Sequence, residues 1–204
     1  MARARHMMLS NLGMTCALHI SKRILKKLDP KKKSSKTNKF ILNEQCHPER
    51  SEGSMKIRVL DIAYETMADG PGLRTSIYCA GCAHHCPGCH NPQSWAFDGG
   101  QEMSVQELLD IVKDDEFANV TFSGGDPLYQ VEAFTELARR IKEETGKTIW
   151  CYTGFTYEEV LADERLSQIL PFIDTLVEGP FVLELRDTNL PFRGSSNQRI
   201  IHLR

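Results

Sequence analysis

After Met55 the chain alternates between two hydrophobic patterns, and this alternation restricts the fold more than any other sequence feature. Five runs rich in β-branched and aromatic residues predict strands, at residues 56–62, 73–80, 119–122, 147–153 and 173–177. Three segments with apolar residues at helical spacing predict helices, at residues 104–113, 130–144 and from 156 onward. Strands and helices that alternate in this way predict an α/β fold with a mainly parallel sheet or a partial barrel.

Two of the predicted helices begin with a capping box. Ser104 and Glu107 stand three residues apart, and so do Thr156 and Glu159. In this motif the hydroxyl accepts a hydrogen bond from the third backbone N–H of the helix, while the glutamate side chain accepts one from the backbone N–H of the capping residue. We therefore expect helices to start at these two places.

Two loops are expected at one edge of the sheet. A polar loop over residues 81–100 follows the second predicted strand, and a Ser-Gly-Gly-Asp-Pro segment at residues 123–127 follows the third. Gly124 and Gly125 permit close backbone approach, whereas Asp126 also suits a simple helix cap. Because chemistry in α/β folds sits at the carboxyl ends of strands, both loops are candidate functional segments.

The chain joins two segments of opposite charge. Residues 1–54 carry 12 Lys and Arg against 4 Asp and Glu, a net charge of +8, whereas residues 55–204 have a net charge of −10. The first segment lacks an apolar period and predicts a basic, disordered extension. Nucleic-acid binding, an organellar transit peptide and a non-native origin are all compatible with it. Residues 44–54 resemble a translated repetitive bacterial DNA element, so we favour the third interpretation, with Met55 as the true start.

The rest of the composition argues against two classes of protein. No apolar run reaches the roughly 18 to 20 residues that a membrane-spanning helix needs, and no secretory signal is visible. The acidic charge of residues 55–204 argues against nucleic-acid binding through a basic surface. We therefore expect no membrane and no nucleic-acid partner.

Four of the seven cysteines crowd into eleven residues, at Cys79, Cys82, Cys86 and Cys89. This spacing is too short for disulfides that join distant loops, and it favours reduced thiolates that hold a metal. One interpretation is a structural zinc site with four protein ligands, the fourth being Cys79 or one of His84, His85 and His90. The other is a cubane cluster held by three cysteines, which leaves one iron open. Cys79 ends a predicted strand, so we expect it to be a small buried hydrophobe.

The spacing of Cys82, Cys86 and Cys89 resembles the signature of radical S-adenosylmethionine (SAM) enzymes. More widely, residues 55–204 resemble the anaerobic ribonucleoside-triphosphate reductase activating proteins within that superfamily. The resemblance rests on four further blocks, Asn91–Trp95, Phe122–Leu128, Trp150–Gly154 and Arg193–Gln198. Many radical SAM enzymes carry an aromatic residue before the third cysteine, but this chain has Gly88, as the activating proteins do.

The resemblance implies a partial (β/α) barrel of the radical SAM type, and it also implies the cofactors and the reaction. Cys82, Cys86 and Cys89 would bind a 4Fe-4S cluster whose open iron is chelated by SAM. Reductive cleavage of SAM would yield a 5′-deoxyadenosyl radical, which would generate a glycyl radical on anaerobic ribonucleoside-triphosphate reductase. The implied SAM contacts are Gly88, Cys89, His90, Ser123, Gly124, Gly125 and Asp126.

The family further implies a cytoplasmic enzyme with reduced flavodoxin or ferredoxin as electron donor. Two alternatives stay open, namely activation of another glycyl-radical enzyme such as a formate lyase, and a non-catalytic interaction module stabilised by zinc. Arg74 is expected either at the cluster or partner side or in a surface salt bridge. Trp95 is expected to pack the cysteine loop. The block at residues 193–198 suggests no chemistry of its own.

Overall fold

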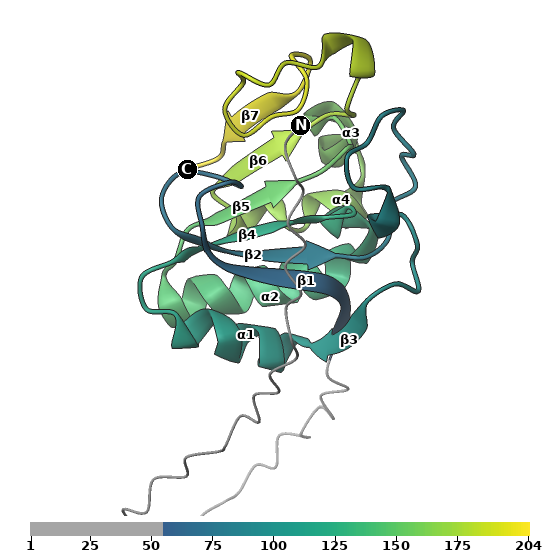
Figure 1. Cartoon of the computed structure of the whole chain (residues 1–204). Helices are drawn as coiled ribbons and strands as arrows, with labels where there is room; N and C mark the ends of the chain where they lie inside the picture. Colours follow the sequence, from purple (N-terminus) through teal and green to yellow (C-terminus); the bar gives the residue numbers. More distant parts are fainter. Residues whose placement is uncertain (1–54) are drawn as a thin grey trace, which may run out of the picture. The chain divides into compact units, whose positions relative to one another are not determined.

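The predicted alternation produces one seven-stranded sheet with helices in residues 55–204, the part of the chain that the computed structural model describes (Figure 1). The predictions for the basic extension, and for Cys16 and Cys46 within it, lie outside these residues. The strands are β1 Lys56–Thr66, β2 Arg74–Cys79, β3 Gln101–Ser104, β4 Asn119–Gly124, β5 Ile149–Tyr152, β6 Thr175–Glu178 and β7 Arg199–His202. The helices are α1 Val105–Asp114, α2 Val131–Thr145, α3 Tyr157–Ala162 and α4 Glu164–Ser167.

The sheet is parallel in its centre and antiparallel at both edges. Its strand order is β3-β1-β2-β4-β5-β6-β7, and β2, β4, β5 and β6 run parallel to one another. β1 and β3 add antiparallel strands at one edge and β7 adds one at the other. β3 and β7 are not paired with each other, so the sheet is open and the expected barrel is not confirmed. The α/β class and the parallel centre are confirmed.

Both predicted capping boxes are present. The Ser104 hydroxyl accepts from the N–H of Glu107, and the Glu107 carboxylate accepts from the N–H of Ser104 at 2.7 Å. Thr156 and Glu159 repeat the arrangement at the start of α3. The sequence pattern does not predict strands β3 and β7, because four-residue edge strands that are largely exposed show no hydrophobic period.

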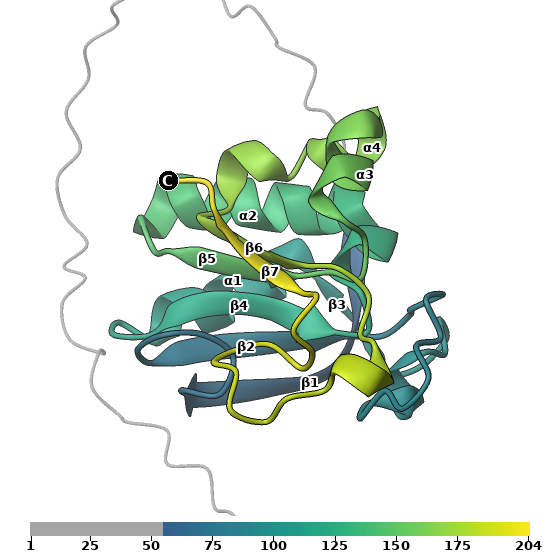
Figure 2. The ribbon, with the colours of Figure 1, turned by 90° about the horizontal axis from the view of Figure 1, so that it is seen from above.

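The two faces of the sheet have different roles. Side chains that alternate along β2, β4 and β5 pack with α1 and α2 in the hydrophobic core; they include Ile77, Cys79, Val120, Phe122, Ile149 and Cys151. The residues between them point to the opposite face. Figure 2 shows the segment between β6 and β7 crossing that face, with α1 behind the strands. Within residues 55–204 no helix is long and apolar enough to cross a membrane.

Arg74 lies in the sheet, at the end opposite the cysteine loop, and is only 1% exposed. Its guanidinium donates to the Thr121 hydroxyl at 2.6 Å and to the Val120 carbonyl at 2.5 Å. The guanidinium carbon also lies 5.6 Å from the centre of the Trp150 ring. Burial lowers the pKa of Arg74 to about 10. Arg74 is therefore a structural cation, and neither a surface salt bridge nor a position at the cluster describes it.

We expect the substitution Arg74→Met to lower the free energy of unfolding by roughly 2–4 kcal/mol, because buried backbone carbonyls lose their donors. Urea denaturation followed by circular dichroism measures this change. The control is Arg165→Met, which removes an exposed ion pair with Glu132 and should cost at most about 1 kcal/mol. Equal losses for the two variants would contradict the structural role of Arg74.

Candidate active site

The three cysteines of the signature lie on a loop that leaves the carboxyl end of β2. Cys82, Cys86 and Cys89 are free and partly buried, whereas Cys79 is fully buried in the core. The expectation that Cys79 is a buried hydrophobe is thereby confirmed. The two ends of the loop are held together by backbone hydrogen bonds, from Gly81 to the Ser94 carbonyl at 2.8 Å and from Cys82 to the Trp95 carbonyl at 3.3 Å.

The chemistry of these donors fits an iron-sulfur cluster. Burial and the charges of Asp126, Cys86 and Cys89 raise the pKa of the Cys82 thiol, while an N–H of His84 opposes the rise, so cluster binding has to displace the proton of this thiol. Within residues 55–204 no three Cys, His, Asp or Glu side chains converge closely enough to hold a single metal ion. A cubane takes each thiolate at a different iron, so its ligands need not meet at one point. Three soft thiols on one short loop satisfy that requirement.

The glycine loop at residues 123–127 packs directly against the cysteine loop. The N–H of Gly125 donates to the Cys79 carbonyl at 2.7 Å, and the N–H of Asp126 donates to the Gly81 carbonyl at 2.9 Å. A Cβ atom on Gly125 would lie only 2.5 Å from the Gly81 oxygen. The expected close backbone approach is therefore real. It is made to the cysteine loop itself, and only glycine permits it.

Asp126 ties three loops together through one buried carboxylate. Oδ1 accepts from the Leu128 N–H at 2.9 Å, which caps the 3₁₀ turn Pro127–Gln130. Oδ2 accepts from the Thr153 hydroxyl and from the Gly154 N–H, each at 2.9 Å, and lies 2.8 Å from His84 Nε2. The side chain is 1% exposed. Asp126 thus holds His84, and with it the cysteine loop, against the end of β5.

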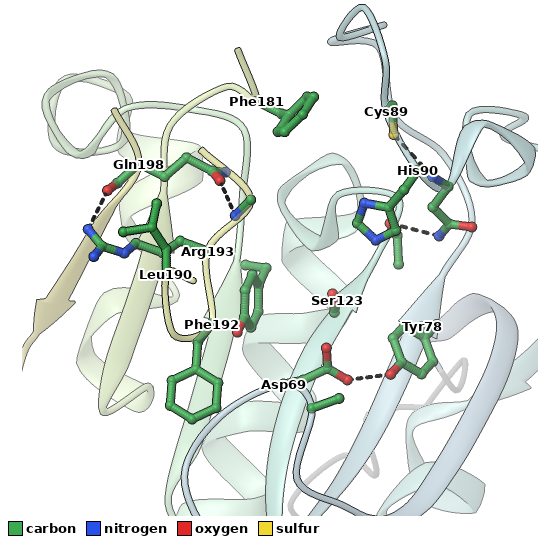
Figure 3. A pocket seen from close by; sticks show the side chains of 15 residues that line it. Asp69, Tyr78, Cys89, His90, Ser123, Phe181, Leu190, Phe192, Arg193 and Gln198 are labelled. Carbon is green, nitrogen blue, oxygen red and sulfur yellow. Dashed lines mark hydrogen bonds between the residues drawn. The ribbon is translucent and has the colours of Figure 1, made fainter. Parts of the chain in front are cut away.

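A cavity of about 500 Å³ opens beside these loops on the face of the sheet that carries no core helix (Figure 3). Four of the residues expected to contact a cofactor line it, namely Cys89, His90, Ser123 and Gly124. Gly125 and Asp126 lie behind its wall and do not line it. Gly88 lines a second cavity of about 320 Å³, and Cys82 and Cys86 line neither.

The floor of the cavity contains residues that the sequence analysis did not single out. Tyr78 of β2 and Tyr152 of β5 flank Ser123 of β4, and the Tyr78 hydroxyl donates to the Asp69 carboxylate (Figure 3). Burial and the contact with Asp69 raise the pKa of Tyr78 to about 12. Burial also raises the pKa of Tyr152. Because side chains alternate along strands, the polar residues between core positions were the available signal.

The block at residues 193–198 builds the wall opposite the cysteine loop. Gln198 accepts from the N–H groups of Gly194 and Ser195 at 2.9 and 3.1 Å, and its Nε2 donates to the Gly179 carbonyl at 3.0 Å. This turn carries Arg193 and Gly194 to the cavity. Trp95 packs within the cysteine loop, with its ring 4.8 Å from that of His85.

Comparison with protein families defines the class of this domain. The sequence model of a family described as a 4Fe-4S single cluster domain matches residues 68–201, which is more than half of the chain. The matched residues include the cysteine loop, the glycine loop and every strand of the parallel centre. The class is therefore a domain with a single iron-sulfur cluster.

Individual relatives narrow this class. The anaerobic ribonucleoside-triphosphate reductase-activating protein of Escherichia coli (strain K12) is 37% identical over 146 residues, covering 68% of this chain and 94% of the relative. The protein of that name from Haemophilus influenzae is 38% identical, covering 66% of this chain and 90% of the relative. The one from Enterobacteria phage T4 is 32% identical, covering 65% of this chain and 85% of the relative. The chain belongs to the family of anaerobic ribonucleoside-triphosphate reductase-activating proteins. The crystal structure of QueE from Escherichia coli overlaps 52% of this chain and 55% of that chain at a TM-score of 0.41 and 18% identity.

We expect Asp126→Asn to lower the free energy of unfolding by roughly 2–4 kcal/mol, because an amide cannot accept all of the hydrogen bonds that the buried carboxylate accepts. Urea denaturation measures the loss. Asp163→Asn is the matched control: Asp163 caps α4 at an exposed position where asparagine serves equally well, so its cost should stay below about 1 kcal/mol. Similar stability of the two variants would contradict the linking role of Asp126.

Proposed function

We propose that this chain is a radical SAM activase of anaerobic ribonucleoside-triphosphate reductase. The observation that carries the proposal is the 500 Å³ cavity, whose wall joins Cys89 and His90 of the cysteine loop to Ser123 and Gly124 of the glycine loop. A ligand in this cavity contacts the cluster loop and the parallel strands at the same time. The partner is proposed from the shared name of the relatives.

Cys82, Cys86 and Cys89 are the proposed ligands of the 4Fe-4S cluster. Three protein ligands leave one iron open for SAM. Held by these three cysteines, a reduced cluster would supply the electron for cleavage of SAM to methionine and a 5′-deoxyadenosyl radical, and that radical would take a hydrogen atom from a glycine Cα of the reductase. The chain supplies soft donors and orients them, and the N–H of Asn91 lies 3.4 Å from the sulfur of Cys89.

The proposed SAM contacts form two groups. Cys89, His90, Ser123 and Gly124 face the cavity, and the Ser123 hydroxyl makes no hydrogen bond with any other described residue, so it is available to a ligand. Gly88 borders the neighbouring cavity. Gly125 and Asp126 act from behind, because their backbone and carboxylate set the distance between the two loops.

The remaining walls suit a reaction that must exclude water. Phe181, Leu190 and Phe192 line the side opposite His90 (Figure 3). Phe192 is anchored by an edge-on contact with Trp150, with the ring centres 5.4 Å apart. A mostly apolar wall over a polar floor favours a bound, oriented ligand and protects a reactive species from solvent.

The proposal extends to the surroundings of the reaction. Reduced flavodoxin or ferredoxin is the proposed electron donor, and the cytoplasm is the proposed compartment. A formate-lyase type partner is the alternative target within the same chemistry. A zinc-stabilised module without catalysis is the alternative from a different class, and the experiment below separates it from the activase.

We expect anaerobically reconstituted full-length protein to hold about four irons and four sulfides per chain, as a cubane requires. The electron paramagnetic resonance spectrum of the reduced cluster should change when SAM is added, because SAM reaches the open iron. Cys82→Ser, Cys86→Ser and Cys89→Ser should each lose the cluster signal and the release of methionine from SAM. Cys79→Ala is the matched control and should keep both, since Cys79 lies in the core.

Two results would contradict the proposal. One is a stoichiometric zinc site that iron and sulfide cannot replace, with no methionine released under reducing conditions; this leaves the zinc-stabilised module. The other is methionine release without any glycyl radical on the reductase, which redirects the same chemistry to another target.

A further inference from the structure

A second cavity of about 320 Å³ adjoins the first, and Gly88 and His90 are its only lining residues among the proposed SAM contacts. Gly88 and Thr188 line this outer cavity but not the inner one, as do Arg186 and Asp187. The two cavities share His90, Phe181, Arg193 and Gly194 in their walls. The outer cavity therefore lies directly beside the inner one, with Phe181 and His90 in the walls of both.

The walls of the outer cavity are formed by two separate loops. Gly88 comes from the cysteine loop, and the other side comes from the segment between β6 and β7, where Arg186 and Ser195 form an isolated β-bridge. Gly88 adopts a φ of +74°, and a Cβ atom there would lie 2.8 Å from Leu183. At Gly88 and Gly194 the place of a side chain is taken by Leu183 and Phe181, so glycine at both positions lets the two loops pack closely around the cavity.

The charge at the outer cavity is opposite to that of the domain. Residues 55–204 have a net charge of −10. Yet Arg186 and Arg193 form no ion pair with a carboxylate in that part of the chain, and Asp187 is already engaged by the Asn189 N–H at 2.8 Å. Arg193 instead donates to the Gln198 carbonyl at 3.0 Å. Unpaired guanidinium groups favour a ligand that brings carboxylates.

We infer that the outer cavity binds an extended, acid-bearing peptide segment of the partner reductase. This inference rests on the proposed function. The segment lies between Gly88 and Gly194, meets Arg186 with a carboxylate, and passes Phe181 so that a glycine reaches the inner cavity. Because the segment and SAM occupy separate cavities, SAM can bind before the segment does.

Charge reversal at Arg186 tests the inference on the full-length, reconstituted protein. Because the side chain lines only the outer cavity, Arg186→Glu should leave methionine release in the absence of reductase unchanged. The reductase concentration that gives half-maximal glycyl radical should rise about tenfold, since a like charge now faces the carboxylate. Added salt should weaken the wild type more than the variant. Arg165→Glu, with the same change in charge on exposed α4, should behave as wild type.

A steric variant gives a second, independent result. Thr188→Trp fills the outer cavity and should lower the maximal yield of glycyl radical about tenfold while methionine release persists. Glu184→Trp, at an exposed position outside the cavity, is its control. The inference is overturned if the glycyl-radical yield of both cavity variants depends on reductase concentration as it does in the wild type. So does loss of methionine release in Thr188→Trp alone, because the outer cavity would then serve SAM.

Failure of the proposed function gives a different pattern. If the wild type releases no methionine, the activase proposal falls, and direct binding of the reductase still tests the outer cavity. Biolayer interferometry should then show about tenfold weaker binding for Arg186→Glu than for Arg165→Glu. Equal binding of the two variants overturns the peptide site.

Discussion

The arrangement of the whole site depends on one close contact between two backbones. Where β2 and β4 end side by side, Gly125 approaches Gly81 so closely that no side chain fits between them, and two N–H groups of the glycine loop bond to the carbonyls of Cys79 and Gly81. This contact sets the distance from the cysteine loop to the carboxyl edge of the sheet. The buried carboxylate of Asp126 then extends the link to β5 through Thr153 and Gly154.

Because side chains alternate along the parallel strands, one face of the sheet forms the core and the other faces the cavity. One face of β2, β4 and β5 supplies the core against α1 and α2, so it is almost purely apolar. The other face can hold polar residues, because the segment between β6 and β7 covers it and leaves a cavity above Tyr78, Ser123 and Tyr152. The structural cation Arg74 occupies the far end of the same face. Stability and chemistry thus use the same strands without competing for positions.

Two adjoining cavities suit the proposed reaction with a small cofactor and a macromolecular target. The inner cavity borders the cluster loop, and the outer cavity opens between that loop and the segment that carries the arginines. The family assignment supports a 4Fe-4S cluster and names the reductase as the relatives' target. It does not divide the space between cofactor and partner. The division that we propose rests on the charged residues that line only the outer cavity.

The sequence by itself determined the α/β class, the helix starts at Ser104 and Thr156 and the pairing of a cysteine loop with a glycine loop, because local periodicity, caps and short motifs encode these features. Tertiary structure alone decided the rest. The open sheet depends on edge strands β3 and β7, which are too short and too exposed to show a hydrophobic period and which pair with β1 and β6, distant in the sequence. Asp69 and Tyr152 line the cavity, whereas Asp126 does not. No local pattern could show this, because it depends on how segments distant in the sequence pack together.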